Sequence, residues 1–175
     1  MGFGDMLKKA GEKLEAKMNK WEQDGIEEEK RRKGCNFIEE LGAELLSKNG
    51  KVKTADALAG KTVALYFSAH WCPPCRGFTP QLAEWYTKDL AAKGLEVVFI
   101  SWDQDENSFQ EYFKAQPWLA LPFTESSKKE ALGKKLKING IPCLVIFDES
   151  GVLITKDGRA AVSKDPTGSK YPWNK

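Results

Sequence analysis

The sequence has no long apolar run, and this absence excludes a membrane-spanning protein. No stretch of the 175 residues approaches the roughly 18 consecutive apolar residues that mark a spanning helix. The first residues also lack the apolar core of a secretory signal peptide. We therefore expect a cytoplasmic protein.

Net charge is also nearly absent. The chain has 27 Lys and Arg against 25 Asp and Glu, and the resulting net charge of +2 is too small to indicate nucleic acid as a partner. Hydrophobic residues make up 41% of the chain, which supplies a core for one compact domain with an extension. We see no internal repeat and expect a monomer.

Metal ligands are scarce. The chain has one His and four Cys, and only Cys72 and Cys75 lie close together in sequence. Because a zinc site needs about four ligands, no metal is expected, and nothing indicates another cofactor. Four cysteines do not form a disulfide framework in a chain of this length, which favours a reducing, intracellular setting.

The strongest signal that is present is the segment Cys72-Pro73-Pro74-Cys75. It follows an apolar, β-prone run at Val63–Phe67, and helix-forming residues with apolar spacing come after it. Proline fits the first turn of a helix because it has no amide hydrogen and its φ is already near the helical value. The pattern predicts a strand, a turn and a helix, with the cysteines at the helix start.

This placement predicts redox chemistry. Cys72 would lie against unpaired amides and the positive end of the helix dipole, where a thiolate, the nucleophile of disulfide exchange, is stabilised. Cys75 lies nearly one turn further along the same face, within reach of a mixed disulfide at Cys72. We expect cycling between dithiol and disulfide, in which Cys72 attacks and Cys75 resolves.

Residues 1–33 differ in composition from the rest of the chain. Apolar residues recur there every three or four positions, with lysines mostly between them: Phe3, Leu7, Ala10, Leu14, Met18 and Trp21. We predict an amphipathic helical extension, followed by a domain at residues 34–175. The sequence favours a helix that packs on its own domain or is partly frayed, and the alternative is binding of a membrane surface or a partner through residues 1–21. The charged run at residues 27–33 is typical of a solvated helix end or linker.

The remaining pattern predicts how the domain is arranged. A strand at Leu95–Ser101 after the redox helix implies a right-handed parallel crossover, which places Trp102 and Asp103 at the same rim as Cys72. A core position is the alternative for Trp102. The other expected elements are a hairpin at Asn49-Gly50, a helix at 106–114, a rigid loop at 117–123, a helix at 126–137, a hairpin of strands at 144–147 and 152–155, and a turn at 157–159.

Six separated motifs resemble the tryparedoxin and nucleoredoxin family of the thioredoxin superfamily. They follow one another in the family's order over roughly residues 36–173: Tyr66 to Pro80, Ile100-Ser101-Trp102-Asp103, residues 117–123, Gly140-Ile141-Pro142, Asp165-Pro166 and Tyr171-Pro172-Trp173. The resemblance implies an α/β, thioredoxin-like fold in which helices flank a central mixed β-sheet. It also implies a protein-disulfide reductase that passes electrons from a low-molecular-weight dithiol or a reductase to client disulfides, peroxiredoxins among them.

The resemblance assigns site residues as well. The family's attacking and resolving cysteines fall on Cys72 and Cys75, and its cis-proline falls on Pro142, which would expose the Ile141 backbone for strand-like pairing with a client peptide. The other residues expected on the active-site surface are Trp71, Pro73, Pro74, Arg76 and Trp102. The two candidates for substrate binding are Asp103 and Arg159.

The chain departs from related proteins at three positions that matter for chemistry, namely Gln104, Tyr66 and Cys143. Gln104 stands where tryparedoxins usually carry an acid that meets the cationic part of trypanothione, and this weakens the case for trypanothione as the electron donor. Tyr66 stands where thioredoxins proper carry a buried Asp. The proton acceptor for Cys75 is therefore not identified, and water and Glu84 are the candidates.

Three further residues have open roles. Cys143, where the family usually has Thr, is expected to be a buried thiol, with a third redox thiol as the alternative. Cys35 is expected to be a packing thiol, with an intermolecular disulfide as the alternative. His70 is expected to be exposed, although it could stabilise the thiolate. For the whole chain, the alternative to an enzyme is a redox-responsive binding or regulatory module of the nucleoredoxin type.

Overall fold

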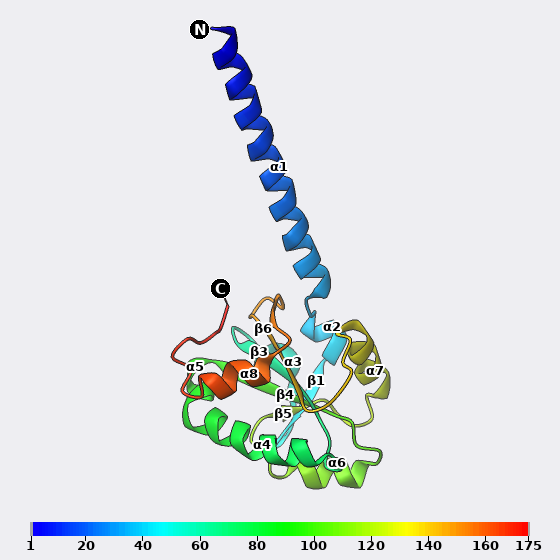
Figure 1. The fold of residues 1–175 in the computed structure, drawn as a ribbon. Helices are drawn as coiled ribbons and strands as arrows, with labels where there is room; N and C mark the ends of the chain where they lie inside the picture. Colours follow the sequence, from blue (N-terminus) through cyan, green and yellow to red (C-terminus); the bar gives the residue numbers. More distant parts are fainter. Residues whose placement is uncertain (1, 175) are drawn as a thin grey trace.

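The computed structural model describes residues 2–174, except for the side chains of residues 27, 28 and 30–33. Its centre is a mixed sheet with helices around it (Figure 1). The sheet has seven strands in the order β2-β1-β5-β4-β3-β6-β7. Strand β3 pairs in parallel with β4, β4 pairs in parallel with β5, and the other pairings are antiparallel. The strands are β1 Glu44–Ser47, β2 Gly50–Lys53, β3 Thr62–Ser68, β4 Leu95–Ser101, β5 Leu119–Ala120, β6 Cys143–Phe147 and β7 Leu153–Thr155.

Helices cover both faces of this sheet, which confirms the predicted fold class. The α-helices are α1 Phe3–Lys33, α2 Phe37–Leu41, α3 Thr54–Ala57, α4 Pro73–Trp85, α5 Ala91–Lys93, α6 Glu106–Phe113, α7 Ser126–Lys135 and α8 Gly158–Lys164, and a π-helical turn, η1 Tyr86–Leu90, joins α4 to α5. Helices α4, α6 and α8 pack on one face, and α2, α3 and α7 pack on the other.

Strand β3 shows why the core has two halves. All seven of its residues are buried, yet its side chains alternate between the faces, as the pleat of a strand requires. Ala64 and Tyr66 join the cluster under α4 and α6, whereas Leu65 and Phe67 join the cluster under α7. The strand is therefore apolar at nearly every position, as expected for a sheet covered on both sides.

Most of the predicted elements are confirmed. The crossover from β3 through α4 to β4 is parallel, and the hairpin at Asn49-Gly50 joins β1 to β2. The redox helix ends at Gly94, whose φ of +107° favours glycine, although the turn η1 inside it was not expected.

Two predictions about loops are wrong. The stretch 117–123 contains β5, which bridges β4 and β1. The turn predicted at 157–159 is instead the start of α8, because Val162 anchors this helix in the core. Gly158 permits the close packing, since a Cβ atom there would lie 2.6 Å from the Leu144 carbonyl oxygen.

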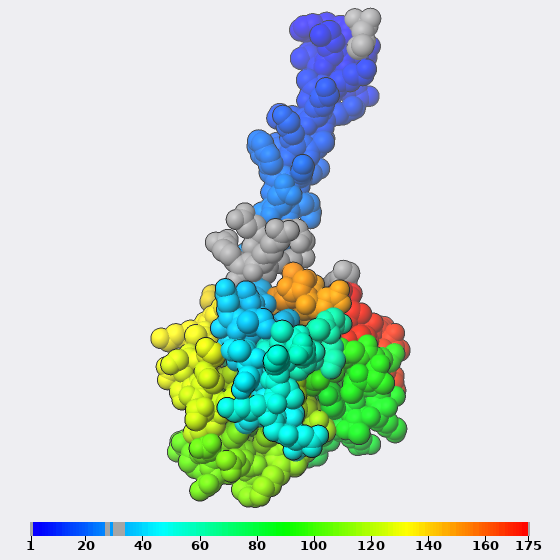
Figure 2. Space-filling view, turned by 180° about the vertical axis from the view of Figure 1, so that it is seen from behind, coloured from blue at the N-terminus to red at the C-terminus, as the bar shows by residue number. Residues whose placement is uncertain are grey.

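Helix α1 extends away from the domain as a single rod (Figures 1 and 2). Every side chain from residue 2 to residue 26 is exposed, including Phe3 at 78% and Trp21 at 69%. The expectation that this helix packs on its own domain is therefore wrong. The charged run at 27–33 was predicted to be a solvated helix end or linker, and most of its side chains lie outside the described set. Within the described part of the chain, no helix is long and apolar enough to cross a membrane.

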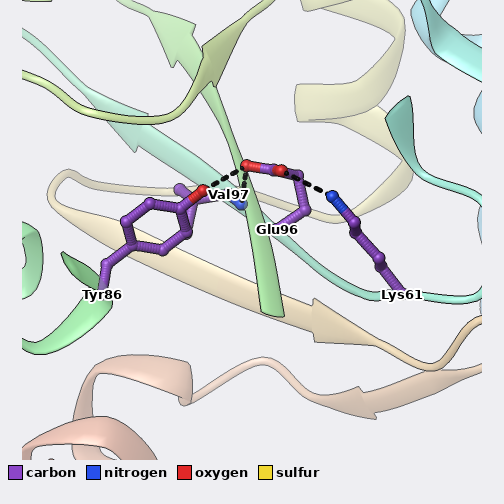
Figure 3. Close-up of polar contacts among 4 residues, drawn as sticks. All are labelled: Lys61, Tyr86, Glu96 and Val97. Carbon is purple, nitrogen blue, oxygen red and sulfur yellow. Dashed lines mark hydrogen bonds and ion pairs between the residues drawn. The ribbon is translucent and has the colours of Figure 1, made fainter. Parts of the chain in front are cut away.

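A buried acid lies at the start of β4, at the opposite end of the parallel strands from the cysteines. Glu96 is 7% exposed, and its carboxylate accepts hydrogen bonds from the Tyr86 hydroxyl at 2.9 Å and from the Val97 amide at 3.2 Å (Figure 3). Lys61 Nζ forms an ion pair with the same carboxylate, 3.2 Å from Glu96 Oε2. Burial raises the pKa of Tyr86, and the nearby carboxylate raises it further. The cluster ties the π-helical turn to the sheet.

Candidate active site

Cys72 caps the N-terminus of α4, as the sequence predicts. Pro73 and Pro74 occupy the first two helical positions, and the Cys75 amide donates a hydrogen bond to Cys72 Sγ at 3.4 Å. The two sulfurs form a disulfide, with their Cα atoms 5.2 Å apart. Cys75 is fully buried, whereas Cys72 keeps 4% of its surface exposed. Of the two cysteines, Cys72 is therefore the one that keeps some contact with solvent.

Three residues cover the cysteine pair: Ala69, Trp102 and Ile141. Cys72 Sγ lies 3.8 Å from the carbonyl oxygen of Ile141. The peptide bond between Ile141 and Pro142 is cis, in agreement with the prediction from the resemblance. The loop between α7 and β6 thus presents its backbone beside the disulfide.

The two tryptophans of the site have different environments. Trp71 is 57% exposed, and its Nε1 donates a hydrogen bond to the Trp102 carbonyl oxygen at 3.1 Å. Trp102 is half-buried and packs against the cysteines as well as against the core cluster under α7. Trp102 therefore belongs partly to the core and partly to the rim, and both expected placements hold in part.

Asp103 supports the turn before the cysteines. It is 3% exposed, and its carboxylate accepts hydrogen bonds from the His70 amide and from the Ser101 hydroxyl, each at 2.8 Å. These bonds hold the end of β4 to the segment between β3 and α4. Both carboxylate oxygens are thus engaged inside the protein, and direct contact with a substrate stays a prediction.

Arg159 lies behind the loop that contains the cis peptide. Its Nη1 donates a hydrogen bond to the Pro142 carbonyl oxygen at 3.2 Å, and its guanidinium lies 5.2 Å from the centre of the Phe78 ring. The other predicted surface residues, Arg76 and the two prolines of the motif, are exposed on the first turn of α4.

A chain of buried hydroxyls lies under the site, and sequence reasoning missed it. Tyr66 bonds Thr79 at 2.6 Å, Thr79 bonds Tyr112, and Tyr112 bonds Ser68 at 2.8 Å. Thr79 is four residues after Cys75 and so lies on the same face of α4. Burial raises the pKa of Tyr66, so its hydroxyl stays neutral. Two signals pointed to this chain, namely the spacing of Thr79 from Cys75 and the shared face of Tyr66 and Ser68.

Glu84 does not fit the role of proton acceptor for Cys75. It is exposed, and its nine-residue separation from Cys75 corresponds to about 13 Å along the helix axis. The exposed His70 stacks its ring on Tyr112 with 5.5 Å between ring centres, so the imidazole is held at the edge of the hydroxyl chain.

The two remaining cysteines differ in burial, since Cys35 is buried and Cys143 is half-buried. Burial raises the pKa of Cys35, and Glu40 raises it further; the residue is 5% exposed. Burial also raises the pKa of Cys143, which is half-buried next to Pro142, although Arg159 acts in the opposite direction. Both environments favour packing thiols. Among the described residues, no three His, Cys, Asp or Glu side chains are grouped to hold a metal ion.

The site can be compared with known proteins. A family model described as thioredoxin-like matches residues 60–153. Tryparedoxin of Trypanosoma brucei brucei is 51% identical over 130 residues, which cover 74% of this chain and 90% of that protein. Human nucleoredoxin is 41% identical over 139 residues, which cover 79% of this chain but only 32% of the nucleoredoxin, so the chain spans about a third of that relative.

Solved structures of tryparedoxins are also similar to this chain. Native tryparedoxin I from Crithidia fasciculata superimposes with a TM-score of 0.74 at 44% identity, over 81% of this chain and 99% of that one. Tryparedoxin II complexed with glutathionylspermidine superimposes with a TM-score of 0.74 at 39% identity, over 79% of this chain and 99% of that one. With its cysteine pair at the start of α4, the chain belongs to the tryparedoxin and nucleoredoxin-like family of thioredoxin-fold dithiol oxidoreductases.

Proposed function

We propose that the protein is a protein-disulfide reductase in which Cys72 attacks and Cys75 resolves. The Cys72 thiolate attacks one sulfur of a client disulfide, so that a mixed disulfide forms and one client thiolate leaves. The Cys75 thiolate then attacks Cys72 Sγ, releases the second client thiolate and leaves the disulfide between Cys72 and Cys75. Two electrons pass to the client, and a donor dithiol restores the pair.

The observation that carries this proposal is the position of Cys72 as the N-cap of α4. Its sulfur accepts the Cys75 amide and lies at the positive end of the helix dipole, and both interactions stabilise a thiolate. Cys75 has no exposed surface, so a client disulfide cannot reach it directly. This difference in access supports the assignment of the two roles.

The loop at Ile141 supports a mode of client binding. A peptide that pairs in an extended conformation with the Ile141 backbone would bring its cysteine against Cys72, whose sulfur is 3.8 Å from that carbonyl oxygen. The exposed Trp71, Pro73, Pro74 and Arg76 would border this peptide on the other side.

The proposed partners follow from the relatives. Peroxiredoxin-like proteins are the proposed clients, and a low-molecular-weight dithiol or a reductase is the proposed donor. The complex of tryparedoxin II with glutathionylspermidine supports a thiol of that class, whereas Gln104 in this chain disfavours the trypanothione contact that an acid would supply. The cytoplasm, a reducing compartment, is the proposed location.

A turnover assay tests this function. The reduced protein should consume the disulfides of insulin or of a peroxiredoxin, Cys72→Ser should abolish turnover, and Cys75→Ser should accumulate a mixed disulfide. Glutathione, trypanothione and a thioredoxin reductase, supplied in turn, identify the donor. Turnover that survives in Cys72→Ser would show that the roles are assigned wrongly.

A second candidate function is a redox-responsive binding module, and the exposed apolar side chains of α1 favour it. We propose residues 1–33 as an extension that targets a redox domain at residues 34–175, either to a partner or to a membrane surface. A partner retained without a cysteine linkage by only the reduced or only the oxidised form would support the module. Equal flotation with anionic liposomes, with and without residues 1–33, would refute membrane targeting.

A further inference from the structure

A groove of about 710 Å³ lies beside the cysteine pair, between Trp102 and the second half of α7. Its apolar lining comes from Trp102 and Ile138, and its charged lining comes from Lys129, Glu130, Lys134 and Lys137. Trp102 packs on the cysteine pair, but the other side chains that line the groove take no part in the exchange chemistry described above. The groove therefore needs its own explanation.

The groove reaches the redox site at two points. Trp102 lines the groove and also packs against Cys72 and Cys75. Asn139, at the end of the groove, is two residues before Ile141, whose carbonyl oxygen lies beside Cys72 Sγ. A polypeptide whose cysteine is held at Ile141 would therefore extend into the groove within a few residues.

The lysines of the groove differ from the other lysines of α7. Lys128 and Lys135 form ion pairs within the domain, with Glu125 and Glu40. Across the described part of the chain, no carboxylate lies within ion-pair distance of Lys134 or Lys137, and both side chains are exposed.

Lys129 is half-buried, with its ammonium 5.7 Å from the centre of the Phe123 ring. Three cations against the single carboxylate of Glu130 leave the groove with a positive charge. Its lining is therefore apolar at Trp102 and Ile138 and basic at its edge.

A second hollow near the redox site differs in charge from the groove. It has a volume of about 410 Å³ and is lined by His70, Trp71, Asp103 and Asp105 among others. The Asp103 carboxylate is buried and bonded inside the protein, and the Asp105 carboxylate caps α6 by accepting hydrogen bonds from Ser108. An acidic segment would therefore meet lysines on the α7 side, whereas no Lys or Arg is among the described residues that line this hollow.

We propose that this groove binds an acidic, partly apolar segment of the client polypeptide next to the attacked disulfide. The inference rests on the proposed reductase function and adds the class of substrate. Carboxylates of the client would pair with Lys134 and Lys137, while an apolar side chain would pack on Trp102 and Ile138. Such complementarity accelerates encounter and selects among partners more than it changes the chemical step.

Three disulfide substrates test the proposal: one peptide with glutamates flanking its cysteine, one with lysines at the same positions, and a small neutral disulfide that does not reach the groove. For the unmodified protein, we expect a kcat/KM at least about tenfold higher on the glutamate peptide, with the advantage declining as salt is added. The variant that combines Lys134→Glu with Lys137→Glu should lose this preference and still reduce the small disulfide normally.

The matched control combines Lys88→Glu with Lys170→Glu, two exposed lysines on η1 and in the C-terminal tail. This control variant changes the net charge by the same amount as the groove variant, and it should keep the preference for the glutamate peptide. Combining Lys134→Gln with Lys137→Gln gives a milder change, and it should lower the preference to an intermediate value. Equal rates on the two peptides, or a preference lost equally in the control, would overturn the proposal. If the small disulfide is not reduced at all, the reductase function itself is wrong.

Discussion

The sulfur of Cys72 lies 3.8 Å from the carbonyl oxygen of Ile141, a residue 69 positions further along the chain. The two are brought together because β6, which follows Ile141, pairs antiparallel with β3, which precedes Cys72, and Phe67 is in register with Cys143. The central strand thus positions both the nucleophile and the backbone that would hold its client.

Thr79 is predicted to stabilise the buried hydroxyl chain. Thr79→Val keeps the shape of the side chain but removes the partner shared by Tyr66 and Tyr112. The loss of those bonds inside the core should lower the free energy of unfolding by about 1–3 kcal/mol. Urea unfolding of the two proteins measures this difference. Thr79→Ser, which keeps the hydroxyl, is the control, and a loss in Thr79→Val no larger than in the control would contradict the prediction.

Tyr86 and Glu96 are predicted to be coupled energetically. Because the Tyr86 hydroxyl donates to a buried carboxylate, Tyr86→Phe should destabilise the fold by about 2 kcal/mol. A double-mutant cycle with Glu96→Gln should show a coupling energy above about 0.5 kcal/mol. Additive effects of the two substitutions would mean that the bond in Figure 3 contributes nothing.

Asp165 is predicted to stabilise the C-terminal segment in a pH-dependent manner. Burial raises the pKa of this carboxyl, but hydrogen bonds from Lys170, Ser169 and Trp173 outweigh burial and lower the pKa to about 2, from an ordinary value of 3.8. Since the folded pKa is the lower one, the contribution is present above about pH 4 and is lost as the pH falls towards 2.

Tryptophan fluorescence, followed during denaturant unfolding at several pH values between 5 and 2, measures this loss of stability. Asp165→Asn should be less stable at neutral pH and should lack this component of the acid dependence. Parallel losses of stability in the two proteins across that range would refute the assignment to Asp165.

The sequence predicts those parts of the molecule that local pattern determines. Apolar runs alone indicate the strands β3 and β4, and the two prolines after Cys72 alone indicate the start of α4. Strand β5 was missed because it has two residues between Pro117 and Pro122, and its partners are far away in sequence. Likewise, Asp157-Gly158 has the composition of a turn, and only the burial of Val162 makes the segment a helix.

The supporting interactions of the site were hidden for the same reason. Tyr66, Thr79 and Tyr112 come from three different elements, so their hydroxyl chain exists only after β3, α4 and α6 have packed. The groove beside Trp102 similarly requires α7 to lie next to the end of β4. The expectation that α1 packs on the domain was wrong because amphipathic spacing shows that a face exists but does not show what covers it.

Alkylation of the reduced protein at neutral pH tests the central claim most directly. Iodoacetamide, followed by peptide mass mapping, gives separate rates for Cys72 and Cys75. A stabilised, reachable thiolate at the start of α4 predicts that Cys72 reacts at least about tenfold faster than Cys75 and faster than an ordinary cysteine. Equal rates at the two cysteines, or a Cys72 that reacts no faster than an ordinary cysteine, would contradict the account.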